Sequence, residues 1–550
     1  MTERNKKFLY YIYVLLILLI LWAAFQLVKI SQKTTESQPV KHGEVFQDTL
    51  TFYVSQVPQT FDVFNALYDQ DIFVFSQIYR GLTRINSNLV EVPDLAEYWD
   101  VSDDHKTYTF YLRRGLYFHD GMPVTMDDFI QSVEFFFSHY PKSYTISYFK
   151  IIDGVEEFMS GRSKKIRGIR KISDYAVEIR LTKPYVPFPK LLSLPQMRIL
   201  PHRYLASDYK ALCETPIGTG PYRVVKKSNE YLVLEAFYLN KIYEPSVKYF
   251  KLIPVLLSKN RAEVMKQHSR RKFDISFIPD SSFLHSSGDL KFRKNTTFNL
   301  VFLGFNCMKA PTDQADFRKA LFAAFNSREI SEKYRGNAIP AEFISPIFLP
   351  KEPGENHSIS SVLNGENKKS SNHLSSLGQF REITFLLDTT HYIRDFSDEI
   401  KRIGDTLGFK SNHVFLNDLD IETQQSLLDT VNTFIFDWQL DLPDPEYFFN
   451  LLFKSDSPMN LFNYKNPEVD SLLEVARFKD ISSDRLKLYS QIEDIIYQDA
   501  PMRPIIYFED YMFYKDYIEG AYLSRLGIPS LELDKISVDK ELYEKHNWKK

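Results

Sequence analysis

The chain has 550 residues, which is too long for one hydrophobic core and predicts two or three lobes. Hydrophobic residues make up 44% and charged residues 25%, the ordinary composition of a folded globular protein. The net charge of −3, from 68 basic and 71 acidic residues, excludes a global basic field and argues against nucleic acid as a partner.

The first element in chain order is the uncharged run FLYYIYVLLILLILWAAFQLV at 8–28. As an α-helix it spans roughly 30 Å, enough to cross a bilayer core. Basic residues precede it, which favours a cytoplasmic N-terminus at 1–7. The best cleavage candidate, Trp-Ala-Ala at 22–24, places a bulky Trp where a small residue is needed. We expect an uncleaved transmembrane anchor at 8–30 and a polar tether at 31–46, with a cleaved signal peptide as the alternative.

Strand-like and helical segments alternate along the rest of the chain, which indicates α/β or α+β lobes. The β-branched and aromatic runs at 50–54 and 107–112 predict strands. Thr-x-x-Asp at 125–128 predicts a helix start. Apolar residues spaced by three and four over 393–408 predict one helical face that ends at a glycine C-cap. Asn-Pro at 466–467 predicts an N-cap followed by proline at the first helical position.

No motif for catalysis or for a cofactor is present. A phosphate-binding P-loop, His-Glu-x-x-His and Gly-x-Ser-x-Gly are all absent from the sequence. His105, His119 and His202 each lie near turn residues, so we expect solvated or capping histidines rather than metal ligands. The two cysteines, Cys213 and Cys307, are expected to be buried free thiols, with no disulfide between them. We therefore predict no enzyme, no metal site and no cofactor.

The stretch FIFDWQLDLPDPEYFFNLLF at 434–453 combines apolar clusters with four carboxylates, at Asp437, Asp441, Asp444 and Glu446. A surface loop would not carry so many aromatic residues, and a plain core strand would not carry so many acids. Residues 434–440 are predicted to form an extended strand. Asp-Pro at 444–445 predicts an N-cap and a first-turn proline for a helix at 446–453.

Several segments of the chain resemble, in order, the family 5 extracellular solute-binding proteins of ABC importers, which include oligopeptide- and dipeptide-binding proteins. The first spans 78–136 and carries Pro-Asp-Leu-Ala, Leu-Arg-x-Gly and Phe-His-Asp-Gly. The others are Gly-Thr-Gly-Pro-Tyr at 218–222 and the segments 305–330, 437–453, 463–477 and 498–508. One such match would be moderate evidence, but six in the family's order make chance similarity a poor explanation.

The resemblance implies an α/β, two-lobed, hinged periplasmic-binding-protein fold of type II, here preceded by the transmembrane helix. Lobe I would comprise 47–298, with an extra subdomain at about 86–194. Lobe II would comprise 299–504, and 505–550 would return to lobe I. Two chain crossings between the lobes would form the hinge, and the ligand would be enclosed when the lobes close.

The resemblance also implies a function. The chain is predicted to be the substrate-binding component of an ABC importer, anchored in the cytoplasmic membrane with its binding domain on the periplasmic or extracellular side. It would bind short peptides and deliver them to permease subunits. The alternatives are a membrane-anchored ligand sensor and a family member that binds a non-peptide solute, such as an oligosaccharide or a metal chelate.

In peptide-binding members of the family, the aspartate of a Trp-x-x-Asp segment accepts the ligand's α-ammonium, and the matching residue here is Asp441. A buried ammonium needs a fixed carboxylate, because a charge left unpaired in a dry cleft costs more than binding returns. Trp438, Leu440 and Asp437 are the other candidate ligand-binding residues. The alternative for Asp441 is a turn acid that caps the following helix, and for Trp438 a core residue. No basic residue is assigned to the ligand's carboxyl end, and the peptide length is not specified.

Overall fold

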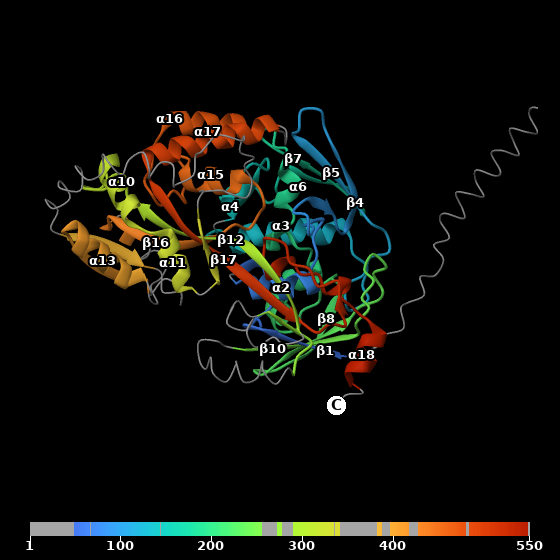
Figure 1. Cartoon of the computed structure of the whole chain (residues 1–550). Coiled ribbons are helices and arrows are strands. Elements are labelled where there is room, and N and C mark those ends of the chain that lie inside the picture. Colours follow the sequence, from blue (N-terminus) through green and yellow to red (C-terminus); the bar gives the residue numbers. More distant parts are fainter. Residues whose placement is uncertain are drawn as a thin grey trace, which may run out of the picture. The chain divides into compact units, whose positions relative to one another are not determined.

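An 11-stranded sheet contains most of the strands, in the order β15-β14-β16-β12-β17-β11-β1-β10-β9-β8, with β13 also paired to β17 (Figure 1). Its two long strands are β12 (Lys291–Phe305) and β17 (Met502–Tyr514), which pair antiparallel. Their pairing is interrupted by a register shift between Thr296 and Leu300. β12 and β17 therefore form the middle of the sheet, and the other strands join it on either side of them.

This computed structural model describes residues 49–547, apart from 67, 144, 256–271, 278–289, 335, 342–381, 388–395, 417–426, 429 and 480–482. The segment from Thr49 onward forms one compact unit. The predicted anchor at 8–30 and tether at 31–46 lie outside the described residues. Within the described ranges, no helix has both the length and the apolar character that a bilayer crossing requires.

Two groups of strands flank the long pair. One group consists of β1 (Thr49–Val54), β8 (Tyr222–Lys227), β9 (Leu232–Ala236), β10 (Tyr249–Pro254) and β11 (Ile275–Phe277). In this group β1 pairs parallel with β10 and β11, and β9 pairs antiparallel with β10 and β8. The other group consists of β13 (Ala338–Pro340), β14 (Glu382–Leu387), β15 (Lys410–Phe415) and β16 (Thr433–Gln439). The predicted lobe boundaries at 298/299 and 504/505 fall inside β12 and β17, and the division into lobes stays a prediction.

Smaller sheets lie outside the large one. A four-stranded antiparallel sheet is formed by β4 (Ala96–Val101), β5 (Thr107–Leu112), β7 (Ala176–Arg180) and β6 (Ile169–Ser173). Two further pairs are β2 (Thr83–Ile85) with β3 (Glu91–Pro93), and β18 (Ile518–Glu519) with β19 (Ser537–Val538). The four-stranded sheet lies within the range 86–194 that was predicted as an extra subdomain.

The helices in the first half of the chain are α2 (Asp69–Ile78), α3 (Met126–His139), α4 (Ile146–Phe149), α5 (Val155–Met159), α6 (Phe188–Leu191), α7 (His202–Leu205) and α8 (Tyr209–Glu214). Those in the second half are α10 (Ala315–Ala324), α11 (Ser327–Lys333), α13 (Phe396–Leu407), α15 (Pro445–Phe453), α16 (Pro467–Arg477), α17 (Ser483–Asp499) and α18 (Lys540–Asn547). Single 3-10 turns lie at η1 (Val63–Asn65), η2 (Pro195–Met197), η4 (Ile528–Ser530) and η5 (Leu533–Lys535).

The locally encoded elements form as predicted. Strands β1 and β5 cover the runs predicted at 50–54 and 107–112. Helix α3 begins after Thr125, whose backbone N–H donates to the Asp128 carboxylate at 2.9 Å in a capping box. Helix α16 begins after Asn466, whose side chain accepts from two backbone N–H groups of the first turn. Helix α13 ends before Gly408, which has a φ of 81°.

The two glycines of the Gly-Thr-Gly-Pro-Tyr motif at 218–222 are required for a steric reason. A Cβ on Gly218 would lie 2.0 Å from the Ile78 carbonyl oxygen, and one on Gly220 would lie 2.2 Å from the Gln77 carbonyl oxygen. The motif therefore packs directly against the backbone at the end of α2, where no side chain fits. His119 joins this contact, with its Nδ1 accepting from the Gly218 N–H at 3.2 Å and its Nε2 3.0 Å from the Gly220 carbonyl oxygen.

The prediction of a solvated or capping His119 is wrong, because this side chain is buried against Phe237 and the glycine motif. His105 does lie in a turn, and His202 is half-buried with its Nδ1 2.7 Å from an Asp128 carboxylate oxygen. Cys213 and Cys307 are free thiols, as expected, but both are half-buried rather than fully buried. Burial raises the pKa of each thiol to about 11.

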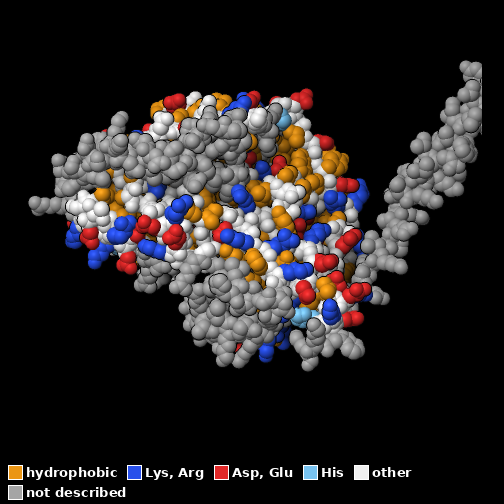
Figure 2. All heavy atoms as spheres, viewed as in Figure 1, with side chains coloured by type: hydrophobic (Ala, Val, Ile, Leu, Met, Phe, Trp, Pro, Cys, Tyr) orange, Lys and Arg blue, Asp and Glu red, His pale blue; other side chains and the backbone are white. Residues whose placement is uncertain are grey.

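Acidic and basic side chains are intermixed over the described part of the face in Figure 2, with no extended patch of one sign. Most aromatic residues in the described part of the chain pack inside: the largest core cluster includes Phe52, Phe302, Phe434 and Phe449. These four residues come from both strand groups, from the long strand β12 and from α15, so one core joins the parts of the unit. Aromatic residues make up 15% of the chain, and those that the structure describes serve mainly the core.

Candidate functional site

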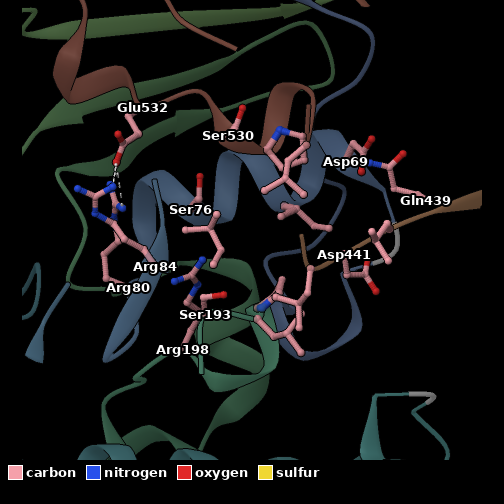
Figure 3. Close-up of a pocket in the computed structure, with 18 residues that line it drawn as sticks. Asp69, Ser76, Arg80, Arg84, Ser193, Arg198, Gln439, Asp441, Ser530 and Glu532 are labelled. Carbon is pink, nitrogen blue, oxygen red and sulfur yellow. Dashed lines mark ion pairs between the residues drawn. The ribbon is translucent and has the colours of Figure 1, made fainter. Parts of the chain in front are cut away.

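A cavity of about 100 Å³ lies where five segments of the chain meet (Figure 3). One face of α2 lines it through Asp69, Ile72 and Ser76, which follow each other at helical spacing. Strand β2, the segment 193–198 around η2 and the C-terminal segment 526–532 supply further walls. The remaining wall is 439–442, the end of β16 and the turn that follows it. That wall is the only part of the lining that comes from the segment 299–504.

One side of the cavity is acidic. Asp441 lines it from the turn after β16, and Asp69 lines it from the first turn of α2 (Figure 3). Burial, together with the nearby Asp441 and Asp437 carboxylates, raises the pKa of Asp69 to about 7. Burial, with Asp69 adding to the effect, likewise raises the pKa of Asp510 to about 8. Asp69 therefore lies within electrostatic reach of three other carboxylates, those of Asp437, Asp441 and Asp510, and a cation bound beside it would relieve the repulsion.

The other side of the cavity is basic, with Arg80, Arg84 and Arg198 (Figure 3). Arg80 pairs with Asp94 at 3.7 Å and with Asp534 at 3.6 Å. The remaining acid on this side is Glu532, which lies 2.9 Å from Arg84 and 4.0 Å from Arg80. Arg198 is buried beside them. The cavity thus has carboxylates on the side of Asp441, whereas the other side has guanidinium groups, of which Arg80 and Arg84 are paired with carboxylates.

Behind the Asp441 turn, Asp444 forms the N-cap of α15 by accepting from the Glu446 backbone N–H at 3.0 Å. The same carboxylate pairs with Arg485 through contacts of 2.8 and 3.0 Å, and both side chains are 2% exposed. Lys190 lies 3.6 Å away. Burial alone would raise the pKa of Asp444, but Arg485 and Lys190 hold it below its usual value. The helix cap is therefore Asp444, as its sequence predicted, and not Asp441.

Of the predicted ligand-binding residues, Asp441 and Leu440 line the cavity. Asp437 lies within electrostatic reach of Asp69 but is not part of the lining. Trp438 is half-buried against the main core and opposite Leu300 in the β12–β16 ladder, outside the lining. The binding roles of all four residues remain predictions.

The sequence analysis missed the basic side of the cavity and Asp69. Asp69 stands at the start of an apolar helical run, where an acidic residue is ordinary, so nothing marked it. Arg198 is far along the chain from Arg80 and Arg84 and becomes their neighbour only when η2 packs against α2. Among the described residues, no group of three or more His, Cys, Asp or Glu side chains has metal-binding geometry.

Residues 91–365, half of the chain, match the model of the bacterial extracellular solute-binding proteins, family 5 Middle. The chain belongs to this family. Its members are extracellular solute-binding proteins rather than enzymes.

Two relatives in the family have different ligands. The dipeptide-binding protein of Escherichia coli K12 is 25% identical over 484 residues, covering 82% of this chain and 87% of that protein. The heme-binding protein A of Haemophilus influenzae is 24% identical over 500 residues, covering 82% of this chain and 85% of that protein. Family membership alone therefore does not specify the ligand.

Among solved structures, the ABC transporter-associated periplasmic binding protein DppA from Helicobacter pylori, in complex with the peptide STSA, is similar with a TM-score of 0.72. The two chains are 19% identical, and the match covers 90% of this chain and 98% of that one. At this identity the likeness concerns the fold alone. It shows the α/β fold of the periplasmic binding proteins, as the sequence predicted.

Proposed function

We propose that this family 5 protein is the substrate-binding component of an ABC importer and that it binds short peptides in the cavity beside Asp441. The observation that carries the proposal is the position of Asp441 on the acidic side of the cavity. A peptide brings an obligatory α-ammonium, and a fixed carboxylate in a water-poor site is the partner that such a group requires. The dipeptide-binding relative supports the same ligand class.

The size of the cavity supports a hinged mechanism. Sites for drug-sized ligands have volumes of roughly 300–1,000 Å³, and this cavity has about 100 Å³. A peptide would therefore enter only when the wall at 439–442 moves away from α2 and η2. The register shift between Thr296 and Leu300 in β12 lies on the path between these walls and is a candidate hinge.

The first test is the identity of the natural ligand. The full chain is purified from its own cells without added ligand and denatured, and the released small molecules are identified by mass spectrometry. Short peptides are expected. A single non-peptide species, such as a heme, a sugar or a metal chelate, would contradict the peptide proposal.

The second test is a thermodynamic cycle at Asp441. Asp441→Asn removes the charge but keeps the shape, and N-acetylation of the peptide removes the ammonium. Each change is expected to weaken binding by about 30-fold to a few thousand-fold, since stranding one partner of a buried charge pair costs roughly 2–5 kcal/mol. Because both changes act on one contact, their costs should not add.

Calorimetric titration of both proteins with the free and acetylated peptide measures the cycle, and Asp405→Asn, which changes an exposed carboxylate of α13 outside the cavity lining, is the matched control. If acetylation weakens binding equally in wild type and Asp441→Asn, Asp441 is not the partner of the ammonium.

We propose further that residues 8–30 hold the protein at the outer face of the cytoplasmic membrane. The support is the uncharged run at 8–28 with basic residues before it. Tethering raises the local concentration of a binding protein near its permease. The full chain should sediment with membranes, resist extraction by high salt and keep its original N-terminus. A mature form that begins near Phe25 and is released from membranes would contradict this.

A further inference from the structure

A contact outside the cavity lining joins the part of the chain at 148–190 to helix α15. The hydroxyl groups of Tyr185 and Tyr447 lie 2.7 Å apart, and both side chains are buried. The Tyr447 ring also packs edge-on against the Tyr148 ring, with the ring centroids 5.0 Å apart. The two parts of the chain therefore meet through aromatic rings whose polar ends bind each other.

Two ion pairs accompany this aromatic contact. Lys190 lies 3.6 Å from the Asp444 carboxylate, and both side chains are buried. Lys183 lies 2.8 Å from Glu474 of α16, and these side chains are 61% and 40% exposed. Interfaces between domains that move apart are more polar than permanent cores. The polar groups of this contact would regain hydrogen bonds from water if the contact opened.

The contact connects parts that the backbone joins at two points. Helices α15 and α16 lie in the segment 299–504, which the chain enters within β12 and leaves within β17. The Asp444 N–H donates to the Leu442 carbonyl oxygen at 2.8 Å, so the contact and the cavity wall at 439–442 belong to one continuous turn. Movement of that wall together with α15, away from α2 and η2, therefore breaks the contact.

We propose that Tyr185 and Lys190 form a latch with Tyr447 and Asp444, which holds the wall at 439–442 over the cavity and slows the release of the ligand. None of these four residues lines the cavity. The inference rests on the proposed binding function and adds the step that limits release. The latch contacts exist only while the wall is closed, so they stabilise the closed arrangement relative to the open one, and opening of such a lid is often the slow step in release.

The first test needs no ligand. The Lys183 amine and the Glu474 carboxylate are close enough for a water-soluble carbodiimide to join them through an amide bond, so the yield of this cross-link reports the latched arrangement. Lys171 and Asp127, which lie 2.6 Å apart within the part of the chain before the latch, give a reference cross-link. Mass spectrometry of the digested full chain measures the ratio of the two yields. Absence of the first cross-link in wild type would overturn the inference.

Tyr185→Asp should open the latch. The new carboxylate would face Tyr447 and lie within electrostatic reach of Glu446 when the wall is closed, but it would lie in water when the wall is open. A buried charge without a partner is strongly destabilising, so the ratio of the two yields should fall at least about tenfold. The matched control is Tyr98→Asp, at a tyrosine of β4 that is 48% exposed, and it should keep the wild-type ratio. A lower melting temperature of Tyr185→Asp with the wild-type ratio would assign Tyr185 to the fold and overturn the latch.

The second test measures release with radiolabelled Ala-Ala-Ala, bound to the full chain and chased with unlabelled peptide. Tyr447→Phe removes one hydroxyl of the latch and keeps the ring, so dissociation should be about 2- to 10-fold faster, the contribution of one buried hydrogen bond. The matched control is Tyr222→Phe, which removes a buried hydroxyl that donates to the Val247 carbonyl oxygen at 3.0 Å. It should release the peptide at the wild-type rate. Equal rates in wild type and Tyr447→Phe, or equal acceleration by both variants, would overturn the inference.

Failure of the peptide proposal is distinguishable from failure of this inference. If Ala-Ala-Ala does not bind but the cross-link ratio falls in Tyr185→Asp alone, the latch is supported and the peptide proposal is not. If Ala-Ala-Ala binds and neither the ratio nor the release rate changes, the latch is wrong and the proposed function is unaffected.

Discussion

The buried pair of Asp444 and Arg485 makes a prediction whose size follows from the structure. Asp444→Asn removes the charge, but the asparagine oxygen still caps α15, since Asn is as good an N-cap as Asp. The loss of this charge leaves Arg485 without its main carboxylate partner and removes one of the carboxylates close to Lys190. Breaking a buried ion pair from one side costs about 3–5 kcal/mol.

The structure places the expected cost at the lower end of that range. Arg485 keeps a contact of 3.5 Å to Glu446, and Lys190 keeps one of 3.5 Å to Glu91. We therefore expect Asp444→Asn to lower the free energy of unfolding by about 3 kcal/mol. Asp444→Ala should cost about 1 kcal/mol more, because it also removes the cap.

The matched control is Glu178→Gln. Glu178 pairs with Arg170 through two contacts of 3.0 and 2.9 Å, much like the Asp444 pair, but these side chains are 28% and 63% exposed. Its loss should cost less than about 1 kcal/mol. Urea unfolding of the full chain, followed by circular dichroism, compares the variants. If Asp444→Asn is no more destabilising than Glu178→Gln, burial does not control the strength of this pair and the reasoning is refuted.

Two further predictions concern Asp69 and Gly218. The folded-state pKa of Asp69, about 7, lies above the 3.8 of an unfolded aspartate, so the folded protein holds more protons and loses stability as the pH rises from about 4 to 7. Asp69→Asn should therefore match wild type in melting temperature at pH 4 and exceed it at pH 8; a difference independent of pH would contradict the assignment. Gly218→Ala should cost more than about 3 kcal/mol, because its Cβ would meet the Ile78 carbonyl oxygen at 2.0 Å. Gly115→Ala, with a φ of 72° and open space around it, should cost about 1–2 kcal/mol; equal unfolding midpoints in urea would rule out the steric explanation of the motif.

The sequence by itself determined the elements whose causes are local. The capping box at Thr125, the Asn466 cap and the Asp444 cap each depend on groups within one helical turn, so the residues carry the whole signal. Strand β16, which ends before Asp441, was predictable for the same reason. Its aromatic run indicates a strand, and the Asp-Pro cap after it marks the start of the next helix. The family, too, was recognisable, since its motifs are short stretches that occur in order.

Only the tertiary structure decided what these elements bring together. His119 was expected near solvent, yet it is buried because the glycine motif 99 residues away packs onto it. Asp444 was predictable as a cap, but its pairing with Arg485, 41 residues away, was not. The cavity joins Asp69, Arg198, Asp441 and Glu532 from separate segments, and no local pattern encodes that meeting. Side-chain charge along a chain does not reveal its partners, because burial and long-range packing decide which charges face each other and which are left for a ligand.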